Sequence, residues 1–305
     1  MITIAHLTDI HLGPIAGFSP RYWNIKRATG FINWHRGRKT AHRQSALDRI
    51  VADMRAHAPD HIAVTGDLAN IGLPAELAAG LAWLTTLGMP ERVTVVPGNH
   101  DIYSTVRADV GVGRWADYMT SDTGGAAYVP VEPGLFPFVR RVGDVAIVGL
   151  NSAIATPPLV AAGALGAGQR DRLAPLLERL RSDGLFRLIL IHHPPLPGQA
   201  SAARGLRDAK ELAAILTRHG AELVIHGHNH RAMLAYQSSL AGDIPVVGAP
   251  SASLSRAHHG EQLARYNLYR IDPADGPRIE MISRGLAEPD GPVIELERRL
   301  LLPHR

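Results

Sequence analysis

Hydrophobic positions in the first two thirds of the chain follow two alternating patterns. Short apolar runs, typical of buried strands, are followed by longer stretches in which apolar side chains recur every three or four positions, as on one face of a helix. Leu47, Ile50 and Met54 have this helical spacing. The patterns predict strands at 2–8, 61–65, 92–96, 145–150, 186–191 and 222–226, and helices at 46–58, 74–87, 169–181 and 207–219.

The helical spacing fades in the last quarter of the chain. There the pattern predicts mainly strands, at 232–237, 245–248, 266–271 and 278–283. Strand–helix units followed by further strands favour an α/β fold, in which two sheets pack face to face and helices cover them. The Gly/Pro-rich stretch 155–168 is interpreted as a long loop, and not as a domain boundary.

Composition and charge narrow the classes of protein. The 305 residues can bury a sizeable core, and the net charge is +4. Seven basic and no acidic residues lie between Arg21 and Arg43, so the rest of the chain has 25 basic against 28 acidic residues. This is one basic insert, and a broad nucleic-acid-binding surface is not expected. No apolar run is long enough for a transmembrane helix, and a strand pattern stands where a secretory signal would lie, so we expect a cytoplasmic protein.

The chain has 16 histidines and no cysteine. This composition excludes disulfides, thiolate zinc sites, iron–sulfur clusters and a cysteine nucleophile. Any metal site must therefore combine histidine with Asp, Glu or Asn.

Polar residues follow five of the predicted strands. The blocks are Asp9-Ile10-His11, Gly66-Asp67, Gly98-Asn99-His100-Asp101, His192-His193 and Gly227-His228-Asn229-His230. Strand C-termini converge at one edge of an α/β sheet, so these blocks can meet although they are far apart in sequence.

The residue types in these blocks predict a centre with two metal ions. Residues i and i+2 of an extended segment share a face, so Asp-x-His and His-x-His each present two ligands together. Seven candidate ligands are too many for one tetrahedral zinc, but they suit two ions if one carboxylate bridges. They are Asp9, His11, Asp67, Asn99, His192, His228 and His230. Mixed nitrogen and oxygen ligands fit Mn, Fe, Zn or Co and do not choose among them.

The ordered blocks resemble the calcineurin-like binuclear metallophosphoesterase family, and most closely its bacterial phosphodiesterase branch, which includes cyclic-nucleotide and glycerophosphodiester enzymes. The resemblance covers residues 1–255 as a catalytic domain. It implies a four-layer α/β/β/α sandwich of two mixed sheets with flanking helices. Residues 256–305 are then a β-rich extension that either completes the sandwich or contacts a second subunit.

The same resemblance implies a role for each site residue. Asp9, His11 and His230 would hold one divalent ion, while Asn99, His192 and His228 would hold the other. Asp67 would bridge them together with a hydroxide that attacks the phosphodiester. His100 would contact the substrate phosphate, Asp101 would orient its ring or raise its pKa, and His193 would line the pocket rim near the substrate.

The basic insert, residues 18–43, suggests the substrate. It interleaves basic residues with Phe18, Tyr22, Trp23, Phe31 and Trp34 directly after the first ligand pair. Such a segment suits an anionic or amphiphilic surface, so we expect a glycerophosphodiester or phospholipid-headgroup substrate and a peripheral membrane contact. A packing or dimer-contact segment is the alternative interpretation.

Other functions share these motifs. A cyclic-nucleotide phosphodiesterase, a phosphomonoesterase and a nuclease would use the same core, and nucleic acid is disfavoured by the acidic balance outside the insert. A metal-free scaffold is disfavoured because all seven candidate ligands are present.

Of the other histidines, His6, His61 and His226 are expected to be buried and neutral within strands, and the rest, His42 included, to lie at the surface.

Overall fold

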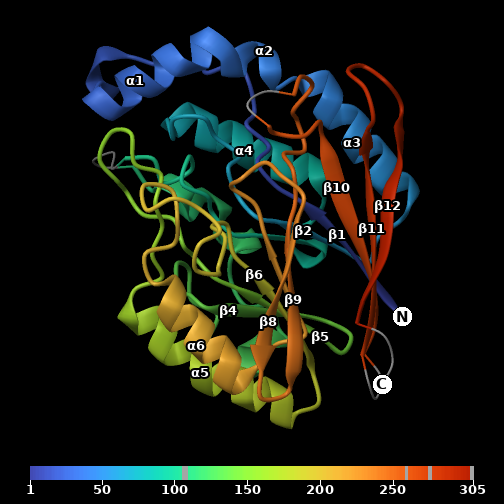
Figure 1. The fold of residues 1–305 in the computed structure, drawn as a ribbon. Helices are drawn as coiled ribbons and strands as arrows, with labels where there is room; N and C mark the ends of the chain where they lie inside the picture. The colour runs from blue at the N-terminus through green and yellow to red at the C-terminus, as the bar shows by residue number, and fades with distance from the viewer. Residues whose placement is uncertain (105–108, 258–259, 274–276, 303–305) are drawn as a thin grey trace.

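The computed structural model of the chain describes residues 1–104, 109–257, 260–273 and 277–302. Two six-stranded mixed sheets lie face to face, and helices cover their outer sides (Figure 1), which confirms the predicted four-layer α/β/β/α arrangement. Figure 1 shows α3 (Gln44–Ala56) and α4 (Pro74–Leu87) on one side of the molecule and α5 (Ala167–Ser182) and α6 (Ala209–His219) on the other.

The first sheet joins the beginning of the chain to its end. Its strand order is β12-β11-β10-β1-β2-β3, and β1, β2 and β3 run parallel to one another. β10 lies antiparallel to β1, with Ile2 opposite Ile271. The bounds are β1 Ile2–Leu7, β2 His61–Val64, β3 Val93–Val95, β10 Arg265–Asp272, β11 Arg278–Leu286 and β12 Val293–Leu302. Residues 293–302 thus form a strand that pairs with β11 of the same chain.

The second sheet has the order β4-β5-β6-β7-β9-β8. β5, β6, β7 and β9 are parallel, and antiparallel strands close the two edges. The bounds are β4 Phe138–Val142, β5 Val145–Gly149, β6 Phe186–Leu190, β7 Leu223–His226, β8 Met233–Ser239 and β9 Gly242–Gly248. Successive side chains of β5 point to opposite faces, so Val145 and Ile147 enter the core between the sheets, while Ala146 and Val148 pack under α5 and α6.

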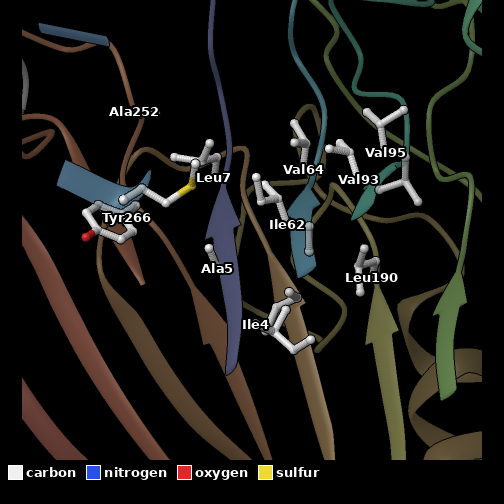
Figure 2. Close-up of a cluster of buried hydrophobic side chains, with 14 of the residues drawn as sticks. Ile4, Ala5, Leu7, Ile62, Val64, Val93, Val95, Leu190, Ala252 and Tyr266 are labelled. Atoms are coloured by element: carbon white, nitrogen blue, oxygen red, sulfur yellow. The ribbon is translucent and has the colours of Figure 1, made fainter. Parts of the chain in front are cut away.

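The core between the sheets fixes the strand ends that carry the polar blocks. Figure 2 shows Ile4, Leu7 and Val64 of the first sheet in the same buried cluster as Leu190 of the second. All four side chains are fully buried. Burying a Leu or Ile side chain stabilises a fold by about 1.5–3 kcal/mol, so the β1, β2 and β6 ends are held firmly relative to one another.

The basic insert forms a helical arm along the top of the view in Figure 1. It comprises a short 3₁₀ turn (Pro20–Tyr22), α1 (Ile25–Asn33), a π-helical stretch (Trp34–Arg38) and α2 (Lys39–Ala41). The apolar spacing did not predict these helices, because α1 buries Lys26 and Arg27 and exposes Ile25 and Ile32. None of the helices in the described ranges has the length and apolar character needed to cross a membrane.

Candidate metal centre

The polar blocks lie just beyond β1, β2, β3, β6 and β7, at one edge shared by both sheets. Short hydrogen bonds join these loops to one another. The N–H of Asp9 donates to the Gly66 carbonyl at 3.0 Å, and the N–H of His11 donates to the Asp67 carbonyl at 2.9 Å. The N–H of His228 donates to Oδ2 of Asp9 at 2.9 Å, so the two sheets are joined at the centre.

Glycines let the loops approach one another closely. A Cβ on Gly98 would lie 2.2 Å from Oδ1 of Asp67, and one on Gly227 would lie 1.9 Å from Oγ1 of Thr8. No side chain fits at either position, because real Cβ contacts are essentially never under 3.0 Å. The glycines of the sequence motifs are therefore required by crowding around the ligands.

Five of the seven predicted ligands have left-handed backbone conformations, with φ between 46° and 71°. They are Asp9, His11, Asp67, His228 and His230. A non-glycine residue in this region costs on the order of 1–3 kcal/mol, and such strain concentrates at functional sites. The surrounding hydrogen bonds therefore hold these side chains in place against a local conformational preference.

All seven predicted ligands meet at this edge. Two groups of three side chains bring their ligand atoms within 4.8 Å of one another: Asp9, His11 and His230 form the first, and Asp67, His192 and His228 form the second. Oδ2 of Asp67 lies 3.4 Å from Nε2 of His192 and 4.0 Å from Nε2 of His11, so this carboxylate lies between the groups. Oδ1 of Asn99 lies 3.1 Å from Nε2 of His192 and joins the second group.

The hydrogen bonds around the two groups direct imidazole nitrogens toward one another and toward carboxylate oxygens. Nδ1 of His11 and Nδ1 of His192 each lie within 3.1 Å of a backbone carbonyl oxygen, so each neutral ring keeps its Nε2 lone pair. Nε2 of His11 then lies 3.4 Å from Nε2 of His230, and Nε2 of His192 faces the Asp67 carboxylate. Nε2 of His228 is buried without a hydrogen-bond partner among the described residues. Converging nitrogen and oxygen acceptors of this kind fit divalent transition-metal cations.

The electrostatics of the site agree with this fit. Burial is the largest effect and favours the neutral forms, but the charge of His192 and its neighbours holds the pKa of Asp67 well below its usual value. Against the same burial, Asp67 raises the pKa of His192 to about 9, and Asp9 raises that of His230 to about 9. The two buried carboxylates are thus stabilised by positive charge nearby, which either protonated histidines or bound cations can supply. Metal binding at these histidine rings would displace their protons.

His100 lies half-buried beside the first group. Its ring meets that of His11 edge-on, with 5.0 Å between centroids, and stacks on Tyr103 at 5.4 Å. Nδ1 is hydrogen-bonded to the Asn70 carbonyl, which fixes the tautomer of the ring. The N–H of His100 donates to Oδ1 of Asp67 at 2.7 Å, so its loop is tied to the centre.

Asp101 has a different place from the one expected. Its buried carboxylate accepts the backbone N–H groups of Asp67, Ala69 and Gly98 at 2.8–2.9 Å. Burial and the charge of Asp67 raise its pKa to about 7. These contacts make Asp101 a positioning residue that holds the loops of the centre, in place of the expected action on the His100 ring.

His193 is also directed at the protein. It is fully buried, its Nδ1 lies 2.8 Å from the Ser152 hydroxyl, and its Nε2 lies 3.1 Å from the Ala161 carbonyl oxygen. Burial lowers its pKa to about 3. Both nitrogens therefore have protein partners, so we assign His193 to the support of the neighbouring His192 and not to substrate contact.

Two further residues reach the centre from segments without ligand motifs. The ring of His42, which was expected at the surface, lies 4.7 Å from that of His11, and its Nδ1 is hydrogen-bonded to Oγ of Ser253 at 2.8 Å. Oε1 of Glu261 lies 3.1 Å from Nδ1 of His230. Carboxylates in this position orient ligand histidines in metal sites.

The histidines within strands are as predicted. His6 and His61 are buried, and each is hydrogen-bonded to a threonine hydroxyl. Burial lowers the pKa of both to about 3 and that of His226 to about 4. His258, His259 and His304 lie outside the described residues.

Comparison with known proteins agrees with this geometry. The sequence model of a family described as "Calcineurin-like phosphoesterase" matches residues 2–232. A probable cyclic nucleotide phosphodiesterase from Synechococcus sp. is 27% identical over 258 residues, which span 83% of this chain and 81% of that protein. A second protein of that description, from Synechococcus sp. strain WH7803, is 35% identical over 100 residues, 31% of this chain and 36% of its own.

Solved structures share the fold at low sequence identity. A dimetal phosphatase from Danio rerio superposes with a TM-score of 0.59 at 15% identity, covering 96% of this chain and 98% of its own. A purple acid phosphatase from yellow lupin (Lupinus luteus) seeds gives a TM-score of 0.52 at 12% identity, covering 96% of this chain and 52% of its own.

Proposed function

Since the chain belongs to the calcineurin-like phosphoesterase family, we propose that it catalyses the metal-dependent hydrolysis of a phosphodiester. One observation carries the proposal: two buried groups of Asp and His ligands lie at one edge with the Asp67 carboxylate between them. Each group offers two imidazoles and one carboxylate, and the side chain of Asn99 adds to the second.

In the proposed reaction, some residues of the chain would bind the metal ions and others would contact the substrate. Asp9, His11 and His230 would hold one cation, Asn99, His192 and His228 the other, and Asp67 both. When bound, two divalent cations supply a hydroxide nucleophile near neutral pH and neutralise charge on the phosphoryl oxygens. His100, with its Nδ1 tied to the Asn70 carbonyl, presents the other side of its ring toward the substrate, where an imidazolium can stabilise phosphoryl charge or protonate the leaving alkoxide.

Metal analysis combined with a substrate panel tests this function. The purified protein should contain about two transition-metal ions per chain and should hydrolyse bis(p-nitrophenyl) phosphate with Mn²⁺ present. Asp67→Ala should lose both metal and activity, while Asp144→Ala, at an exposed carboxylate, should keep both. A folded protein that binds no metal and hydrolyses no ester would instead favour a scaffold.

The insert supports a glycerophosphodiester or phospholipid-headgroup substrate. Trp23, Ile25 and Ile32 are 58%, 74% and 48% exposed, and Ile25 and Ile32 lie seven positions apart on one face of α1. The basic residues Arg21, Arg36 and Lys39 are exposed on the same arm. Exposed Trp and Ile beside basic groups are typical of helices that lie on an anionic membrane surface.

Vesicle sedimentation tests the membrane contact. The full-length protein should pellet with vesicles of phosphatidylcholine and phosphatidylglycerol, and much less with phosphatidylcholine alone. The triple variant Trp23→Ser, Ile25→Ser, Ile32→Ser should stay in the supernatant, because it removes the apolar contact and leaves the buried anchors of the arm intact. Equal and negligible pelleting of both proteins rules the contact out.

A cyclic nucleotide is the second candidate substrate, and the descriptions of the two Synechococcus relatives favour it. A panel of glycerophosphocholine, phosphatidylcholine, a cyclic nucleotide, a phosphomonoester and single-stranded DNA separates the candidates. All of these activities would use the same dimetal core, so the core alone does not identify the substrate. The substrate with the highest kcat/KM in the panel therefore identifies the substrate class.

A further inference from the structure

One lysine of the insert points into the molecule. Lys26 lies in the first turn of α1 and is only 6% exposed. Its Nζ donates to Oγ1 of Thr156 at 2.6 Å and lies 4.4 Å from the centroid of the Tyr103 ring. The ammonium is thus enclosed by the insert, the loop after β3 and the loop after β5.

Among the described residues, the ammonium has no matching anion. The Thr156 hydroxyl donates its own proton to the Val160 carbonyl and accepts one N–H of Lys26, so the other two N–H groups have no hydrogen-bond acceptor in the described part of the chain. No carboxylate of the described residues lies within the 4.0 Å of an ion pair with Nζ, and the neighbouring Arg27 adds further positive charge. A buried ammonium with two unused donors is costly unless something pairs with it.

Lys26 is connected to the candidate metal centre through the Tyr103 ring. The Tyr103 ring that it contacts also stacks on His100. Asp67 lies close enough to raise the pKa of Lys26, although burial and Arg27 prevail and lower it to about 8. The ammonium is therefore largely charged near neutral pH, and the Tyr103 ring connects it to His100, which we propose to contact the substrate.

We propose that Lys26 binds a second anionic group of the substrate, next to the reacting phosphate. This inference rests on the proposed function. A carboxylate or a second phosphate would take up the two unused donors in charge-assisted hydrogen bonds. Such bonds discriminate between charged and uncharged substrates by about tenfold or more.

Chromogenic diesters that differ only near the proposed subsite test the inference. The probes are p-nitrophenyl phosphodiesters carrying a propyl, a 2-carboxyethyl or a 2-phosphonoethyl group, and kcat/KM is measured for each with Mn²⁺ present. The wild type should prefer an anionic probe over the propyl probe by about tenfold or more. The anionic probe with the larger gain shows whether a carboxylate or a phosphoryl group fits better.

The variants separate binding from a purely structural role. Lys26→Met should abolish the preference for the anionic probes, mainly through KM, and Lys26→Arg should retain much of it. Lys210→Met removes the same charge from an exposed position of α6 and should keep the preference. Arg27→Met loosens the anchoring of the insert to the Ile71, Gly72 and Ser104 carbonyls, and its preference should also persist in the fraction that folds.

The outcomes distinguish the two proposals. Hydrolysis of all three probes without a preference for charge overturns the subsite and leaves the proposed function standing. A preference that survives in Lys26→Met also overturns it. Failure to hydrolyse any probe refutes the proposed function, and the subsite with it.

Discussion

Acid should destabilise this fold through histidines that are buried without charge, and His61 allows the effect to be isolated. His61 is 2% exposed on β2, and its Nε2 is hydrogen-bonded to the Thr94 hydroxyl at 2.7 Å. Burial, with the charges of Arg140 and Arg92, lowers its pKa from 6.5 to about 3. It lies at the start of β2, at the opposite end of that strand from the candidate metal ligand Asp67.

The sign and size of the effect follow from proton linkage. Below pH 6.5 the unfolded chain takes up a proton at this position and the folded chain does not, so stability is lost as the pH falls from 6.5 toward 3. The loss is about 1.4 kcal/mol per pH unit, which gives about 2 kcal/mol for His61 at pH 5. His6, whose pKa is also lowered to about 3, should lose a similar amount.

Urea denaturation followed by tryptophan fluorescence at pH 7 and pH 5 measures the loss. His61→Gln keeps a neutral group near the Nε2 position and does not titrate, so its stability should fall by about 2 kcal/mol less than that of the wild type. His35→Gln, at an exposed position, should follow the wild type. An identical loss in His61→Gln and wild type would refute the assignment of acid sensitivity to this buried ring.

Three further outcomes test the centre itself. Asp101→Ala leaves three buried N–H groups without their acceptor and should lower the free energy of unfolding by about 3 kcal/mol or more in urea titrations; an unchanged midpoint would contradict the positioning role. A strong chelator should lower the midpoint of thermal unfolding, since cations bind the native site and not the unfolded chain, and equal midpoints with and without it would count against bound metal. His100→Asn should lower kcat by about 100-fold or more at unchanged metal content; an unaffected kcat would remove His100 from the reaction.

The convergence of the candidate ligands was predictable because each of them stands in a short motif directly after a strand. Strand order then brings such motifs to one edge, whatever their separation in sequence. His42 and Glu261 carry no such signal. They reach the centre from the insert and from the C-terminal part of the chain, through contacts such as the hydrogen bond between His42 and Ser253, which no spacing rule predicts.

The elements that the pattern did not predict break the rule that apolar residues mark the buried face. In β4 the charged Arg140 is only 4% exposed, because its guanidinium donates to the backbone carbonyls of Pro90, Asp117 and Thr120. β12 is an edge strand in which half of the side chains are exposed and only one is buried, so its charged residues obscure the strand pattern. In α1 the usual relation between polarity and burial is reversed, because the charged Lys26 is buried and the apolar Ile25 is 74% exposed.

The burial of Lys26 and the exposure of Ile25 in α1 suggest that the insert and the metal centre have separate roles, one in substrate choice and the other in hydrolysis. The candidate metal ligands follow strand ends, five of the seven have strained backbones, and neighbouring glycines are crowded, so few substitutions fit there. The insert is attached to the same edge from outside, through the hydrogen bonds of Arg27 to loop carbonyls. α1 therefore buries Lys26 and exposes Ile25, and Trp23 just before the helix is exposed as well. Under the proposed function, changes in the sequence of the insert would alter which phosphodiester is bound while the candidate ligand set stays intact.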